Sequence, residues 1–231
     1  MPEQIKIVFE RRWLIFFILL EGLTVPLVAS SNKLAVQNIV YMAIMGFVVA
    51  FICVLSLCFV LKRYLLRNAP QLLGVAIDDI TNLWYLGIIA GFLLMIMFTV
   101  QDIMYHHGAG DFSVGFTSGF LSVAISLVIY ELLAHYCNLA ISFKHDQQIW
   151  QIRFTQRDIL LLALIFAVYE FFVCPITSLW VPLQQHRILV ASISGLAGGL
   201  FGGILLIVIS YCLRSSPPSI CLRPSKININ N

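Results

Sequence analysis

Residues 83–104 read LWYLGIIAGFLLMIMFTVQDIM, and this stretch decides the class of the fold. Its first charged residue is Asp102, near its far end. An α-helix rises ~1.5 Å per residue, so the stretch is long enough to cross a hydrocarbon core of ~30 Å. Trp84 and Tyr85 mark the level at which such a helix enters lipid, because aromatic rings favour the membrane interface. We therefore predict a transmembrane helix here.

The same pattern recurs along the chain of 231 residues, of which 60% are apolar and 11% charged. A soluble domain is about 45–50% apolar and about 25% charged, so a soluble core could not bury this much apolar surface. Apolar stretches of spanning length cover residues 13–31, 39–61, 83–104, 112–143, 158–182 and 188–213. The sequence predicts an all-α fold, a polytopic membrane helical bundle of six transmembrane helices within residues 1–214.

The distribution of Lys and Arg predicts the orientation of these spans. Alternate connections carry twelve of these residues against two, Lys33 and Arg187. Cytoplasmic loops are the ones enriched in Lys and Arg, so both termini are expected in the cytoplasm, N-in and C-in. We expect the bacterial inner membrane as the location. A rival interpretation takes Arg11-Arg12 and the following WLIFFILL as a cleaved signal peptide, which would leave five spans.

Two segments outside the spans have their own expected structures. Residues 70–82, PQLLGVAIDDITN, are too polar for the membrane core and are predicted to form an interfacial helix. Residues 215–231 are rich in Ser, Pro and Asn, and we expect a disordered cytoplasmic tail.

Three glutamates inside the spans are candidate functional residues, because a carboxylate in lipid must be protonated, paired or turned to a cavity. Glu170 lies thirteen residues after Arg157, and Glu131 lies thirteen residues before Lys144. Both are then ~20 Å from the cytoplasmic edge and at the same depth. Glu21 is expected at a shallower level.

A polar stripe strengthens the case for the fourth span. Glu131, His135, Asn138 and Ser142 follow one another at i, i+4, i+7 and i+11, which places them on one face of a helix. Such a stripe faces protein or water rather than lipid. It is interpreted either as a solute or proton path or as a hydrogen-bonded seam between helices.

The first and fifth spans share a glutamate five residues before a proline, in Glu21–Pro26 and Glu170–Pro175. Proline removes a backbone hydrogen bond from the helix and frees carbonyl groups. The similarity raises the alternative of a duplicated helical hairpin, with chance similarity as the other explanation.

The sixth span contains the glycine row Gly195, Gly199 and Gly203 beside a second row, Gly198 and Gly202. Such rows allow helices to approach closely, so the first row is a candidate face for a homo-oligomer or a membrane partner. The lipid bilayer is the other expected partner. No basic run with interleaved aromatics occurs, so no nucleic-acid partner is expected.

An outer-side cluster of Asp102, His106 and His107 offers the chemistry of a divalent metal site, which His186 would complete. The alternative is a solvated interfacial loop, and no other cofactor is expected.

These features favour a small transporter or permease-like protein, with a proton or cation bound by Glu131, His135 and Glu170 and assisted by Glu21 and Asn138. The alternatives are a non-catalytic subunit of a membrane complex and, third, an intramembrane enzyme. For an enzyme, no complete set of nucleophile, base and oxyanion stabiliser is present in the sequence.

Overall fold

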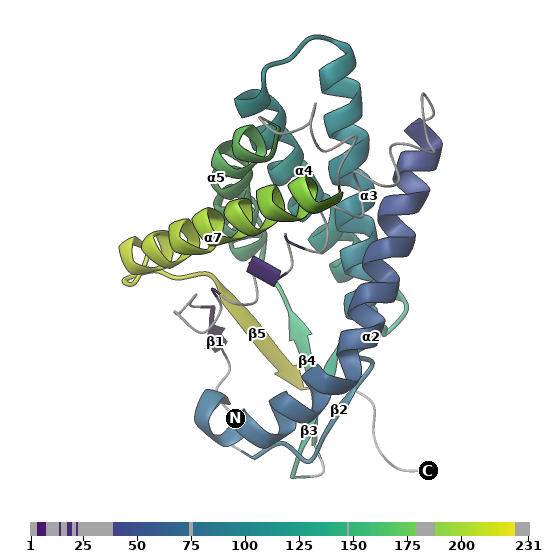
Figure 1. The fold of residues 1–231 in the computed structure, drawn as a ribbon. Helices are drawn as coiled ribbons and strands as arrows, with labels where there is room; N and C mark the ends of the chain where they lie inside the picture. The colour runs from purple at the N-terminus through teal and green to yellow at the C-terminus, as the bar shows by residue number, and fades with distance from the viewer. Residues whose placement is uncertain are drawn as a thin grey trace.

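The computed structural model describes residues 4–7, 14, 18–19, 22, 39–73, 76–146, 148–178 and 188–224. The described chain is mostly helical, with a small sheet at one end of the helices (Figure 1). The helices are α2 (Ile39–Leu73), α3 (Tyr85–His106), α4 (Asp111–Tyr136), α5 (Gln156–Ser178) and α7 (Ile188–Cys212). The strands are β1 (Gln4–Lys6), β2 (Asp79–Thr81), β3 (Ser142–His145), β4 (Gln148–Arg153) and β5 (Ser219–Pro224).

Within the described residues, four helices are long and apolar enough to cross a membrane: Tyr85–His106, Asp111–Tyr136, Gln156–Thr177 and Ser192–Cys212. In α2, the pieces Gly46–Ser56 and Cys58–Asn68 meet at a bend of 45° and would make a fifth span if they act as one. These helices suit a protein embedded in a membrane. The first predicted span, residues 13–31, lies outside the described residues except for isolated positions.

The expectation of an all-α fold is corrected by an antiparallel sheet, which among the described residues has five strands in the order β1-β5-β4-β3-β2. Its strands come from the N-terminal segment, from the α2–α3 and α4–α5 connections, and from the segment after α7. Each of these segments was expected on the cytoplasmic side. A short strand leaves little trace in a hydropathy pattern, and here each one depends on partners from distant parts of the chain.

Two segments therefore differ from expectation. In the predicted interfacial helix 70–82, helix α2 continues to Leu73, but residues 79–81 form β2, with Ile80 opposite Phe143. In the predicted disordered tail, residues 219–224 form β5, which pairs with β1 on one side and β4 on the other. Composition alone suggested disorder, whereas hydrogen bonds to two neighbouring strands order the segment.

The fourth helix is shorter than its apolar stretch of 112–143. It ends at Tyr136, followed by Asn138 in the left-handed region with φ 53°, which Asn tolerates better than most residues. The amide of Leu139 then donates to the carbonyl of Leu133, six residues earlier, at 3.2 Å, and this bond closes the end of the helix. The chain continues into β3 instead of extending the span.

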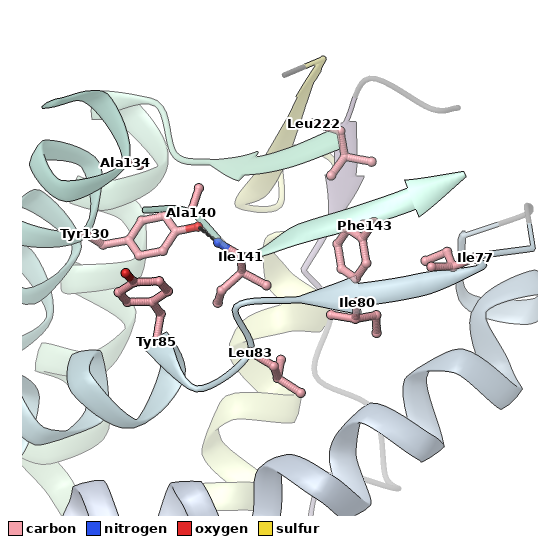
Figure 2. Packing of buried hydrophobic residues seen from close by; sticks show 10 residues of the cluster. All are labelled: Ile77, Ile80, Leu83, Tyr85, Tyr130, Ala134, Ala140, Ile141, Phe143 and Leu222. Carbon is pink, nitrogen blue, oxygen red and sulfur yellow. Dashed lines mark hydrogen bonds between the residues drawn. The ribbon is translucent and has the colours of Figure 1, made fainter. Parts of the chain in front are cut away.

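A hydrophobic cluster joins the sheet to the helices (Figure 2). Its buried members come from the strands, from the start of α3, from the end of α4 and from the connections between them. They are Ile77, Ile80, Leu83, Tyr85, Tyr130, Ala134, Ala140, Ile141, Phe143 and Leu222. The cluster fixes the sheet at the ends of α3 and α4.

Helix α4 packs tightly against α5 through glycine. A Cβ atom added at Gly119 would lie 2.8 Å from the carbonyl oxygen of Phe166 and 2.9 Å from the Cβ of Glu170. One added at Gly115 would collide with the backbone carbonyl of Glu170 and lie 2.8 Å from the Cβ of Cys174. The absence of side chains at these two glycines is what lets α5, and Glu170 with it, approach α4.

Candidate functional site

Glu131 is held at the sheet end of α4 by Arg153, the last residue of β4. Its Oε2 accepts hydrogen bonds from Arg153 Nε at 2.9 Å and Nη2 at 2.8 Å. Its Oε1 accepts from the backbone amide of Phe154 at 2.5 Å. The two charged side chains are 19% and 14% exposed, so the pair is largely withdrawn from water. Glu131 is thus paired with a cation and a backbone donor.

Tyr130, the neighbour of Glu131, completes this junction. Its hydroxyl donates to the carbonyl of Ile152 at 2.9 Å. The same hydroxyl accepts from the amide of Ile141 at 3.1 Å (Figure 2). These bonds satisfy backbone groups on both sides of the β3–β4 hairpin. We call Tyr130, Glu131 and Arg153 the sheet clamp, because they attach α4 to β4.

The predicted polar stripe of Glu131, His135, Asn138 and Ser142 is not continuous in the structure. His135 and Asn138 are exposed, and the ring of His135 meets that of Tyr136 at 4.9 Å. Ser142 is buried in β3, opposite Gln151. The helix ends before Asn138, so the helical spacing no longer applies to the last two residues.

Glu170 lies at a different level from Glu131. It is buried, with 8% exposure, in the middle of α5 against Gly119 of α4. Twelve residues of α4 separate Gly119 from Glu131, which corresponds to ~18 Å along the helix. The prediction of equal depth is therefore wrong. It counted from Lys144 as though the helix reached that residue, whereas α4 ends at Tyr136 and the chain turns into the sheet.

Other polar groups lie in the same part of α3, α4 and α5. Gln101 Nε2 of α3 donates to Ser118 Oγ of α4 at 3.3 Å. The hydroxyl of Tyr105 and the thiol of Cys174 lie 3.3 Å apart, which joins α3 to α5. The Asp111 carboxylate, at the start of α4, is within hydrogen-bonding reach of Tyr105.

These residues form what we call the polar cluster, which lies in the halves of the three helices that are remote from the sheet. Its members are Gln101, Tyr105, Asp111, Ser118, Glu170 and Cys174. Ser118 is fully buried and Cys174 is 6% exposed. The buried carboxylate of Glu170 thus lies in the same halves of the helices as these hydroxyl, amide and thiol groups. Glu170 was found from the sequence, but its neighbours on α3 and α4 were not.

The outer-side residues proposed for a metal are only partly together. His106 Nδ1 lies 2.9 Å from the carbonyl oxygen of Asp102 and 3.6 Å from its carboxylate, and its side chain is 71% exposed. Among the residues that the structure describes, no group of three or more His, Cys, Asp or Glu side chains could hold a metal ion. His107 is exposed just after α3, and His186 lies outside the described residues.

The glycine rows of α7 face inward. Gly198 and Gly202 lie against Thr177, Val173 and Tyr169 of α5, and the row Gly195, Gly199 and Gly203 is also buried within the chain. Leu196, Leu200, Ile204 and Val208 form the exposed side of this helix.

Glu21 and Pro26 lie outside the described residues, so the suggested repeat of the first and fifth spans stays a prediction. The neighbouring Gly22 is described. A Cβ added there would lie 2.6 Å from Cδ2 of Leu196, which places this point of the first predicted span beside α7.

Comparison of this chain with models of protein families, with curated proteins and with solved structures finds no match. The features of this chain that bear on function are therefore the polar cluster and its position in the helices.

Proposed function

We propose that the protein is a small transporter of the bacterial inner membrane, with six spans and both termini in the cytoplasm. The sheet supports this arrangement, because β1 and β5 pair although they stand near opposite ends of the chain. The helix pairs α3–α4 and α5–α7 each begin after one strand and lead to the next. On this proposal, each helical pair that returns to the sheet crosses the bilayer twice. A first pair, formed by residues 13–31 and α2, would complete the six.

The transported or coupling ion is a proton, and Glu170 is the residue that binds it. The observation that carries this proposal is a carboxylate with 8% exposure in the interior of a helix that is apolar enough to span the membrane. Burial in a medium of low dielectric constant favours the neutral form of a carboxyl group. Carboxylates at such depths mark proton relays and ion pathways in membrane proteins.

The surroundings of Glu170 suit a proton better than a large solute. The titratable groups that face this region are Tyr105, Asp111 and Cys174, and the other polar neighbours are Gln101 and Ser118. Hydroxyl and amide groups donate to the ionised carboxylate and accept from the protonated one. The same site can therefore accommodate both protonation states during a cycle.

Proton flux into proteoliposomes tests the proposal. The purified protein is reconstituted with the pH-sensitive dye pyranine inside, and a pH gradient is imposed while potassium and valinomycin clamp the membrane potential. We expect the wild-type protein to carry a proton flux and Glu170→Gln, which keeps hydrogen bonding but not titration, to lose at least ~90% of it. Asp102→Asn is the matched control, since it neutralises another carboxylate of the same helices outside the polar cluster. An unchanged flux in Glu170→Gln overturns the assignment.

The alternative function is a non-catalytic membrane subunit. It is favoured by the contacts of the polar cluster, which tie α3, α4 and α5 together and would serve equally to hold helices in place. In that case Glu170→Gln lowers the stability of the isolated protein, the wild type carries no proton flux, and a partner copurifies. The exposed side of α7 is then the surface for that partner or for a second copy.

A further inference from the structure

We propose that three serines of α4, Ser118, Ser122 and Ser126, form a hydrated path that carries protons between Glu170 and the sheet end of the helices. The inference rests on the proposed function of Glu170 and assigns the inner half of its proton pathway. We call these three residues the serine line. They follow one another at i, i+4 and i+8, so they occupy one side of the helix on successive turns.

All three serines are fully buried, with 0% exposure, in a helix that is otherwise rich in large apolar residues. Ser118 Oγ donates to the carbonyl of Gly115 at 3.2 Å and accepts from Gln101 at 3.3 Å. Ser122 Oγ donates to the carbonyl of Gly119 at 3.1 Å. Each of these hydroxyl oxygens retains capacity to accept a further hydrogen bond.

Ser126 differs from the other two serines and points to a ligand. Its Oγ is buried and has no hydrogen-bond partner in the described part of the chain, not even the carbonyl one turn earlier that serines in helices commonly use. A buried hydroxyl without a partner is destabilising, and such groups are usually satisfied by ordered water. Water is the ligand whose size and chemistry match a single hydroxyl in an apolar interface.

The spacing of the line fits alternating hydroxyls and water molecules. Side chains four residues apart on a helix are about 5–6 Å apart at their Cβ atoms. Two hydrogen bonds of ~2.8 Å between oxygen atoms span the same distance, so one water fits each gap. For Ser118 and Ser122 the hydroxyl first turns its O–H from the backbone carbonyl to the next water. A proton arriving at the serine oxygen then forms a new O–H bond there, while the original O–H bond breaks and its proton passes to that water. One proton is gained and one is passed on at each oxygen, and the line keeps no net charge.

The two ends of the line lie on α4 at the levels of the two glutamates. At the upper end Ser118 adjoins Gly119, whose added Cβ would lie 2.9 Å from Cβ and Cγ of Glu170. At the lower end, one turn after Ser126, Tyr130 is buried with its hydroxyl bonded to Ile152 and Ile141. On this proposal the line runs from the level of Glu170 to the turn of α4 that carries the sheet clamp.

A packing role for the serines predicts the opposite order of mutant effects. If Ser126 only allows α4 and its neighbours to approach, Ala is tolerated and Thr, with its extra methyl group, disrupts the interface. If Ser126 supplies a hydroxyl to the line, Thr retains the hydroxyl and Ala removes it. The order of the two variants therefore separates the explanations.

The test uses the same proteoliposomes and the internal dye. We expect Ser126→Ala and Ser122→Ala each to lower the proton flux roughly tenfold, the change expected when one hydrogen bond of the path is lost, and Ser126→Thr to stay close to wild type. Ser113→Ala is the matched control, because Ser113 lies on the same helix, is exposed and bonds only to the Gly110 carbonyl. Circular dichroism of each variant shows that it is folded.

Three results decide the matter. A flux that is lost in Glu170→Gln but kept in both Ser→Ala variants overturns the serine line and leaves the proposed function intact. Lower flux in Ser126→Thr than in Ser126→Ala also overturns it, in favour of packing. A wild-type protein without proton flux overturns the proposed function and the serine line together.

Discussion

Glu131 and Glu170 are the same residue type on two adjoining helices, but they occupy different environments. Glu131 lies at the sheet end of α4, where it forms an ion pair with the guanidinium of Arg153 and accepts a hydrogen bond from the amide of Phe154. Glu170 lies ~18 Å further along the bundle, against Gly115 and Gly119 of α4, in the part of the helices that holds the polar cluster. The first carboxylate forms an ion pair with a cation that strand β4 holds in place. The second lies among groups that suit either protonation state.

Depth in a membrane sequence therefore does not identify a functional carboxylate. Both glutamates satisfied the rule that an intramembrane acid requires an explanation. For Glu131 the explanation is attachment of α4 to the sheet, and for Glu170 we propose proton binding. The following predictions test this division, in order of decreasing effect.

The largest effect is expected where α4 and α5 are closest, at Gly115. In Gly115→Ala the new methyl group meets the backbone of Glu170, which cannot rotate away, so the helices must separate. We expect a loss of about 2–3 kcal/mol in the free energy of unfolding, measured by titration with dodecyl sulfate in mixed micelles. Gly110→Ala is the control, because an added Cβ there meets nothing within 4 Å, and it should change stability by less than about 1 kcal/mol. Equal stabilities of the two variants would contradict the close approach.

The sheet clamp should contribute to stability and not to ion binding. Glu131→Gln leaves Arg153 without its carboxylate, and we expect a loss of about 2 kcal/mol, less than for a fully buried pair because both side chains keep some exposure. The coupling is measured by a double-mutant cycle with Arg153→Gln. Proton flux per folded molecule should equal that of the wild type. A stable Glu131→Gln variant without flux would reverse the roles assigned to the two glutamates.

The buried carboxylate of Asp158, which also lies at the sheet end, should hold strand β5 in place. Its Oδ1 accepts from the amide and hydroxyl of Ser219 at 2.9 and 3.2 Å, and its Oδ2 accepts from Thr155 Oγ1 at 2.5 Å. Asp158→Ala should cost about 1 kcal/mol and increase hydrogen exchange at the amides of β5. Ser216→Ala, which removes an exposed contact with Arg157, should leave exchange in β5 unchanged. Unaltered exchange in Asp158→Ala would show that strand pairing alone orders this segment.

The smallest effect is expected for the exposed ion pair between Lys62 of α2 and Asp79 of the edge strand β2. The hydrogen bond from Lys62, at 2.7 Å, lowers the pKa of Asp79 below its ordinary value of 3.8. The pair therefore contributes stability above that value and loses it as the pH falls through the lower pKa of the folded state. Both side chains are more than 40% exposed, so the contribution should stay below about 0.5 kcal/mol. The difference in unfolding free energy between the wild type and Asp79→Asn should be constant near neutral pH and shrink below about pH 4. A constant difference down to about pH 2 would contradict it.

The sequence identified the helices well because lipid imposes a length and a polarity on each one. The stretches 83–104 and 188–213 correspond closely to α3 and α7. It missed the strands, since a strand such as Gln4–Lys6 has no periodicity of its own and exists only through its partner Ser219–Cys221. It also missed the serine line, although the spacing of four between Ser118, Ser122 and Ser126 was readable in the printed sequence.

The amino-acid sequence by itself determined a membrane-embedded helical protein and placed Glu170 within an apolar helix, because hydrophobicity and helical rise are local properties. Only the tertiary structure decided that Glu131 pairs with Arg153 and that Glu170 meets Gly115 and Gly119 of α4. Those contacts join residues far apart in the chain, and no local pattern encodes which of two similar carboxylates will find a cation. The two glutamates differ because α4 ends at Tyr136. The chain then enters the sheet, and strand β4 supplies Arg153 to Glu131 but not to Glu170.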